Sequence, residues 1–167
     1  GLIGSKVTLG AFPIKGLSIE SSREALISNL IKEACFAETL GVAELTAALK
    51  WCDHPEISAH LSEVLEEETE HAHLAWKALK WLVESAPIQE QDQLNVLVQT
   101  TFAEVSQAFG LTYSETLMND RSSAMVQTSI NRFGVLTEHQ TQQVRAEAFK
   151  SVIMPALKAA QWSQKIA

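Results

Sequence analysis

The sequence predicts an all-α protein built on one long antiparallel helix hairpin that is followed by C-terminal helices. Glycine and proline, which interrupt helices, number only 7 and 4 among 167 residues. Apolar residues recur at spacings of three and four along most of the chain, which is the period of a helix with one buried face. Helix-capping sequences separate these periodic stretches. The chain is long enough for one domain with its own core.

The composition excludes several classes of function. The net charge is −7 and the basic residues are scattered, so we expect no nucleic-acid partner, which would require a clustered basic face. No apolar run approaches the length of a membrane span, so we expect no membrane partner. Cys35 and Cys52 lie too far apart along one predicted helix to form a disulfide with each other. We interpret them as reduced core residues and expect a cytoplasmic protein.

Residues 1–20 look like an extended lead into the helical part of the chain. Four residues interrupt any helical period there: Gly4, Gly10, Pro13 and Gly16. A structureless lead of this length is unusual in a free-standing domain and is more typical of a crossover between helices. We therefore divide the chain into this crossover-like lead and a single helical domain over residues 21–167.

The first helix should begin at the capping sequence Ser21-Ser22-Arg23-Glu24 and run to about Trp51. Its apolar stripe contains Ile27, Leu30, Ala34, Ala37, Gly41, Leu45 and Ala48. Glu38 falls inside this stripe, so its carboxylate should face the interior. The helix should end at Asp53-His54-Pro55, where Asp53 or His54 caps the next helix and Pro55 occupies its first turn.

The second helix should cover residues 55–84 and contains two overlapping Glu-x-x-His frames. Its apolar stripe is formed by Leu61, Val64, Leu65, Ala72, Ala75, Leu79 and Leu82. Glu68 and His71 lie on this stripe one helical turn apart, so both side chains can hold one ion. The competing pair, Glu70 and His73, lies on a face that we expect to be solvated. That face also carries Lys77, Lys80 and Glu84.

The connection between these helices is so short that they must pack antiparallel, as a hairpin over residues 22–84. Residues that face each other then have numbers with a nearly constant sum, about 107 for this turn. Glu38 paired with Glu68, and Glu38 paired with His71, both come close to that sum. The three side chains should therefore lie at one height, roughly 23 Å from the turn.

The remaining chain should form C-terminal helices over residues 89–164. One helix is predicted over about 89–109 and ends at Gly110. We consider an inward-facing position for Glu104 on this helix. It is the weakest candidate for a metal ligand, because no His follows it three residues later.

Two further capping sequences divide the end of the chain, Thr112-x-x-Glu115 and Thr137-x-x-Gln140. The first should open one or two short helices within residues 113–133, which Gly134 stops. The second should open a last helix that runs to about Trp162. Pro155 predicts a kink or a break inside that helix.

The predicted meeting of two carboxylates and an imidazole indicates a metal site. A carboxylate on an apolar stripe is costly to bury unless it is protonated, paired or bound to a metal ion. Glu38 and Glu68 would repel each other, and a divalent cation removes this conflict. We therefore predict Glu38, Glu68 and His71 as metal ligands, with Fe as the cofactor and Mn as the second choice, because oxygen-rich sites with one imidazole suit these ions. The alternative is a hydrogen-bonded network without metal.

Other polar and aromatic residues near the motif fit ordinary structural roles. We expect Glu63, Glu66, Glu67 and Glu70 on a solvated face. Trp76 and Trp81 are expected to pack rather than to relay electrons. No catalytic residue can be named from the sequence, and the small-molecule substrate is unknown.

At these residues the sequence resembles the ferritin-like superfamily of di-iron carboxylate four-helix bundles, and more narrowly a group of uncharacterised bacterial ferritin-like proteins. The resemblance rests on EACFAETL at residues 33–40 and EETEHAHLAW at residues 67–76, with a softer match over residues 134–157. In that superfamily, each half of the bundle provides one Glu from one helix and Glu-x-x-His from the next. The resemblance implies that Glu38, Glu68 and His71 are the ligands of the second half.

The chain departs from this family because the first helix pair of the bundle is missing. Residues 1–20 resemble the crossover that would follow that pair, and no other Glu-x-x-His lies on an apolar stripe downstream. Three ligands cannot complete a two-metal site, but two chains related by a two-fold axis would supply the full set. We therefore predict a homodimer through the 22–84 hairpin. In a longer protein, an upstream helix pair would take the same place.

The resemblance implies a di-metal protein, with di-iron first, that acts as an oxidoreductase or ferroxidase using O₂ or peroxide. The superfamily hosts several activities on one fold, so the reaction stays open. One alternative is a metal-free helical interaction or structural domain with a relic site. Another is an iron storage or scavenging module. An acidic funnel of Glu63, Glu67 and Glu70 would favour iron entry, whereas an apolar channel beside Glu38 would favour a substrate oxidase.

Overall fold

The computed structural model describes residues 22–111 and 128–159, and within these ranges the chain is helical with no strand. The elements in order are α1 (Arg23–Leu30), η1 (Ile31–Phe36), α2 (Ala37–Trp51), α3 (Pro55–Glu84), α4 (Ile88–Ala108), η3 (Asn131–Phe133), α5 (Glu138–Ala148), η4 (Phe149–Ile153) and α6 (Met154–Ala159). The all-α prediction is confirmed for these residues. The predictions for residues 1–20, for the cap at Thr112 and for the chain's end near Trp162 lie outside the described residues.

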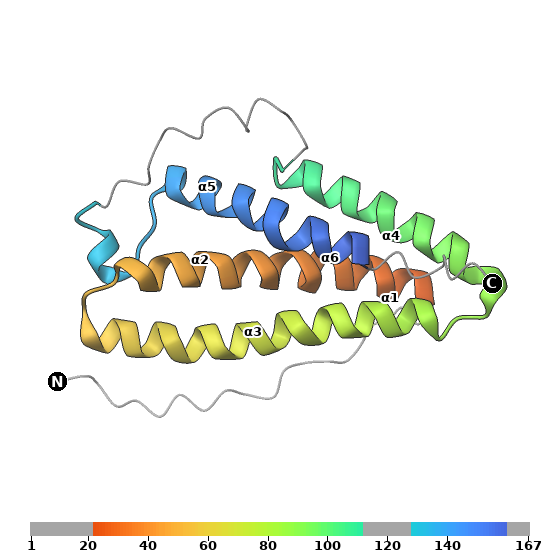
Figure 1. The fold of residues 1–167 in the computed structure, drawn as a ribbon, viewed down its shortest axis with the longest axis horizontal. Helices are drawn as coiled ribbons and strands as arrows, with labels where there is room; N and C mark the ends of the chain where they lie inside the picture. The colour runs from red at the N-terminus through yellow and green to blue at the C-terminus, as the bar shows by residue number, and fades with distance from the viewer. Residues whose placement is uncertain (1–21, 112–127, 160–167) are drawn as a thin grey trace, which may run out of the picture.

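The long hairpin is made by α1, η1 and α2 on one side and α3 on the other (Figure 1). Figure 1 shows α3 along one side of α1–η1–α2, with α4 and α5 on the opposite side. At the open end of the hairpin, the Arg23 guanidinium donates to the Leu82 carbonyl at 2.5 Å and to the Ser85 hydroxyl at 2.9 Å. At the closed end, the Asp53 N–H donates to the Arg132 carbonyl at 3.2 Å. Both ends of α3 are therefore tied to other elements.

Helix starts follow the capping chemistry of the sequence. Ser22 is the N-cap of α1, and its hydroxyl accepts from the Ala25 N–H at 3.1 Å. A complete capping box joins Thr137 and Gln140 at the start of α5. Pro55 stands in the first turn of α3 behind the N-cap His54, which makes no side-chain capping bond.

The first long helix differs from its prediction because it contains a π-helical turn, η1. Ile27 is buried before this turn. Inside the turn the buried positions are Ile31, Cys35 and the adjacent Phe36, and after it they continue at Leu40. A π-turn adds one residue to a helix and so moves the buried stripe forward by one position. The predicted stripe is therefore wrong at Ala37, which is exposed.

The core lies between α1–α2, α4, η4 and the C-terminal half of α3. Phe36, the residue that ends η1, is fully buried at its centre. Its ring lies 5.2 Å from that of Phe102 and 6.2 Å from that of Phe149. Trp76 stacks on Phe102 at 5.6 Å, so the packing role predicted for this tryptophan is confirmed. These aromatic contacts join four elements around the π-turn.

The C-terminal helices match their predicted signals with one exception. Helix α4 ends beside Gly110, and η3 ends at Gly134, and both glycines adopt positive φ angles of 67° and 72°. The helix that contains Pro155 is interrupted by η4, because proline cannot donate to the carbonyl four residues earlier. Glu104 is exposed, so its considered inward position is wrong: the buried stripe of α4 passes through the adjacent Val105.

The state of the two cysteines and the lengths of the apolar helices agree with what the sequence composition predicts. Cys35 and Cys52 are both free thiols, and burial raises the pKa of Cys35 to about 12. Cys35 is a core residue, whereas Cys52 is half-buried and donates to the Arg132 carbonyl at 3.4 Å. None of the helices in the described ranges is long and apolar enough to cross a membrane.

Candidate metal centre

The structure brings the three predicted ligands together. Glu38 comes from the first turn of α2, and Glu68 and His71 come from the middle of α3. One potential ligand atom from each of the three residues lies within 4.8 Å of the other two. The three side chains therefore lie at one height of the hairpin, as their residue numbers predicted.

Local structure fixes each of these side chains. Glu68 and His71 are neighbours on one turn of α3, and the Nδ1 atom of His71 lies 3.5 Å from an Oε atom of Glu68. Glu38 is the second residue after η1, so the π-turn sets the direction in which it projects. The residue after it, Thr39, accepts a hydrogen bond from the Trp76 indole N–H at 3.0 Å. This partly buried bond fixes α2 against α3 beside the site.

The site is more open than the sequence predicted. The side chain of Glu68 is 31% exposed and that of His71 is 60% exposed, so the prediction that both lie on a buried stripe is wrong within one chain. The buried residues of α3 are Ala75, Leu79 and Val83, all in its C-terminal part. The N-terminal part of α3 is covered by α2 on one side and approached by Gly134 at Ile57 and Leu61, and it contains no fully buried residue.

The two carboxylates of the site differ in how readily they hold a proton. The hydrogen bond to Glu68, then burial and the Glu68 charge, raise the pKa of Glu38 above its usual value of 4.5. The same hydrogen bond, supported by His71, lowers the pKa of Glu68. Two carboxylates this close cannot both ionise without repulsion. A divalent cation would neutralise both, so the donor set fits Fe(II) or Mn(II) with His71 as the nitrogen ligand.

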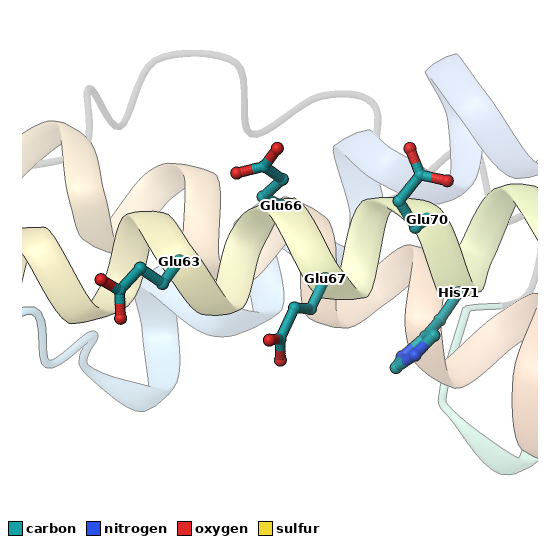
Figure 2. Close-up of a pocket in the computed structure, with 5 residues that line it drawn as sticks. All are labelled: Glu63, Glu66, Glu67, Glu70 and His71. Atoms are coloured by element: carbon teal, nitrogen blue, oxygen red, sulfur yellow. The ribbon is translucent and has the colours of Figure 1, made fainter.

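An acidic surface extends from His71 toward the start of α3. Glu63, Glu66, Glu67 and Glu70 line an open pocket together with His71 (Figure 2). Figure 2 shows that Glu67 and His71 project from one side of the helix, whereas Glu66 and Glu70 project from the other. All four carboxylates belong to exposed residues, as predicted.

The competing Glu-x-x-His frame does not gather a third ligand in the part of the chain that the structure describes. Glu70 and His73 are both exposed, and neither belongs to a group of three side chains that could hold a metal ion. The choice of Glu68 and His71 over this frame therefore agrees with the geometry.

Sequence reasoning missed the exposed apolar residues on the same face of α3 as His71. Leu74 is 66% exposed and Trp81 is 65% exposed. Trp81 was predicted to pack in the interior, and this prediction is wrong for a single chain. Val64, on the other side of His71, is 41% exposed, so its predicted place on the buried stripe is wrong. Steps of three and four residues from His71 reach Leu74 and then Trp81, and this spacing would have indicated a second apolar stripe. Only the first stripe, the one that was expected to be buried, was considered from the sequence.

Comparisons of the chain with protein-family models, with curated proteins and with solved structures found no match. The assignment of the site therefore depends on the arrangement of this chain's own residues. The strongest single feature is the convergence of two carboxylates and one imidazole from two helices.

Proposed function

We propose that the protein is a ferritin-like di-metal carboxylate protein that binds iron through Glu38, Glu68 and His71. The observation that carries this proposal is the approach of their donor atoms to within 4.8 Å of one another. Two carboxylates this close together mark a place where a cation relieves repulsion. Carboxylate oxygens with one imidazole per ion are also the donors that helix-bundle di-iron sites use.

A second copy of the chain would complete the site. Three ligands are too few for two metal ions, whereas two chains related by a two-fold axis would supply four carboxylates and two imidazoles. The exposed edge of His71 and the uncovered N-terminal part of α3 leave room for that second chain. We therefore propose a homodimer formed through the hairpin.

The reaction that fits this site best is oxidation of Fe(II). Hydrogen peroxide would take one electron from each of two Fe(II) ions, together with two protons, to give water. Glu38, whose pKa is raised, is the carboxyl of the pair that holds a proton more readily, and it would release that proton when a cation binds. Glu68, which stays ionised more readily, would supply the permanent negative charge. His71 would have to be neutral to donate its lone pair.

An iron-scavenging role is the second candidate, and the acidic pocket on α3 favours it. Four carboxylates beside His71 would raise the local concentration of cations. This role needs binding and oxidation of iron without turnover of an organic substrate. It differs from the metal-free interaction domain, in which Glu38, Glu68 and His71 would form a hydrogen-bonded network without an ion.

The test is the metal content of the protein, measured by elemental analysis after growth with iron and purification without chelators. We predict about one transition-metal ion per chain in the wild type, half of a two-metal site shared by two chains. The variant Glu68→Ala/His71→Ala should lose this metal. The matched control is Glu70→Ala/His73→Ala, which removes the same residue types from the neighbouring frame and should keep it.

Peroxide consumption then separates the alternatives. Wild type and control should oxidise Fe(II) with one peroxide for every two ions, and the ligand variant should not. Absence of metal from both the wild type and the control would contradict the di-metal proposal and leave the interaction domain.

A further inference from the structure

We infer that two copies of the chain join along one stripe of α3, with the two α3 helices antiparallel and the two-fold axis beside the candidate metal centre. The inference names the partner surface of the proposed site, and it rests on the proposed function only in assuming that a second chain completes that site. It adds a register, which says which residue of one chain meets which residue of the other.

The stripe has the spacing of a coiled-coil seam. Eight positions of α3 alternate steps of three and four: Ile57, His60, Val64, Glu67, His71, Leu74, Ala78 and Trp81. Most of these residues are exposed, and none is fully buried. Leu74 and Trp81 are among the most exposed apolar side chains of the described residues. A heptad stripe without a covering helix is the surface that a second helix occupies.

The stripe is complementary to itself when it is reversed. In an antiparallel pair of helices, the numbers of two facing residues add up to a nearly constant sum. If that sum is about 138, each residue of the stripe faces a residue of the same stripe on the partner chain. Leu74 then meets the partner's Val64, and Trp81 meets the partner's Ile57. His71 meets the partner's Glu67 at the centre. Apolar side chains therefore meet apolar ones in two kinds of pair on each side of the axis, with His60 meeting the partner's Ala78 between them. Imidazole meets carboxylate in the middle.

The residues that flank the stripe give mixed pairs in the same register. On the side away from α2, Glu63 meets the partner's Lys77, and the two-fold axis repeats this pair of opposite charges. On the same side, Glu70 meets the partner's Glu70 and Glu56 meets the partner's Glu84, so like charges also face each other there. On the side toward α2, Glu68 meets the partner's Glu68 close to the axis. Because Glu68 is the carboxylate already shared with Glu38, this register brings the two half-sites face to face.

The uncovered part of α3 supports a second copy as the occupant. Between Pro55 and Leu74 the helix contains no fully buried residue, although its C-terminal part packs in the core. Self-association would cover this part, because Val64 of each chain would lie under Leu74 of the other. It would also surround the acidic centre with apolar residues.

The first test is site-directed disulfide formation in the full chain carrying Cys52→Ser, since Cys35 is buried and its thiol pKa is raised. Val64→Cys combined with Leu74→Cys should give covalent dimers under a thiol oxidant, because this register places the two sulfur-bearing positions together. Val64→Cys combined with Trp81→Cys is the matched control. It is out of register by seven residues, about 10 Å, and should stay monomeric on denaturing gels.

The second test reverses the flanking charges, which are exposed and so leave folding unaffected. Glu63→Lys and Lys77→Glu should each raise the dimer dissociation constant about 5- to 30-fold, because each converts two attractive pairs into repulsive ones. The double variant Glu63→Lys/Lys77→Glu should restore dimer affinity. Sedimentation equilibrium measures all three.

The two proposals fail separately. Metal at about one ion per chain in a dimer, without the Val64–Leu74 cross-link and without rescue by the double charge reversal, overturns the register and keeps the metal site. The cross-link and the rescue without any metal uphold the register and overturn the proposed function. A wild-type chain that is monomeric with or without iron overturns the inference.

Discussion

Glu38 and Glu68 show how two identical side chains acquire different chemistry from their surroundings. Glu38 sits deeper, against α3, and its pKa is raised, whereas Glu68 accepts its hydrogen bond and has a lowered pKa. A raised carboxyl pKa adds stability at low pH, and this stability is lost as the pH rises through the folded-state pKa. A lowered one adds stability that is lost as the pH falls. The pair is therefore most stable when it holds one proton.

This difference predicts the pH dependence of the metal-free protein. Between the acidic range and neutral pH, the free energy of unfolding should fall as Glu38 loses its proton and the two carboxylates repel. Glu38→Gln, which keeps a hydrogen-bond donor but cannot ionise, should remove this fall and also abolish metal binding. Urea unfolding at several pH values, with a chelator present, measures it. Glu33→Gln changes an exposed carboxylate one turn earlier and should behave like the wild type; a similar change there would contradict the assignment.

At the scale of elements, the two π-helical turns decide how the helices meet. The turn η1 lets Phe36 follow Cys35 into the core, and η4 brings Phe149 against Phe36 at 6.2 Å. An uninterrupted α-helix from Ile27 would instead carry the core stripe through Glu38. The extra residue therefore keeps Phe36 in the core and leaves Glu38 at the edge that faces Glu68.

The turn after η3 is a second place where an element depends on one residue. Gly134 has a φ of 72°, and a Cβ atom there would lie 2.5 Å from Cδ1 of Leu61 on α3. We predict that Gly134→Ala lowers the free energy of unfolding by about 2–4 kcal/mol, the sum of backbone strain and overpacking. Gly110→Ala, with a φ of 67° and nothing within 4 Å of the new Cβ, should cost only about 1–2 kcal/mol. Equal losses would show that contact with Leu61 is unimportant.

For the whole molecule, metal binding and assembly should be linked to stability. A ligand that binds only the folded protein adds about 2.7 kcal/mol when its concentration is 100 times its dissociation constant. For a chain of this length, that corresponds to a rise in Tm of about 5–10 °C. We predict this rise when Fe(II) is added anaerobically to the wild type. Calorimetry should also show a Tm that increases with protein concentration, because dimers dissociate on unfolding.

The ligand variant provides the control for this linkage. Glu68→Ala/His71→Ala should show no rise in Tm with Fe(II). Its dimer should persist through the apolar ends of the α3 stripe. A metal-dependent rise that survives in this variant would place the stabilising ion elsewhere.

The sequence by itself determined the helical class, the hairpin and the height at which Glu38, Glu68 and His71 meet. These follow from local periods, from caps such as Thr137 and from a short connection, which act between near neighbours in the chain. The tertiary structure decided which face of each helix is covered. The π-turn before Glu38, the exposure of His71 and the open stripe through Leu74 depend on packing between distant segments. A stripe pattern says that a residue can be buried, and only the arrangement of neighbouring helices decides whether it is.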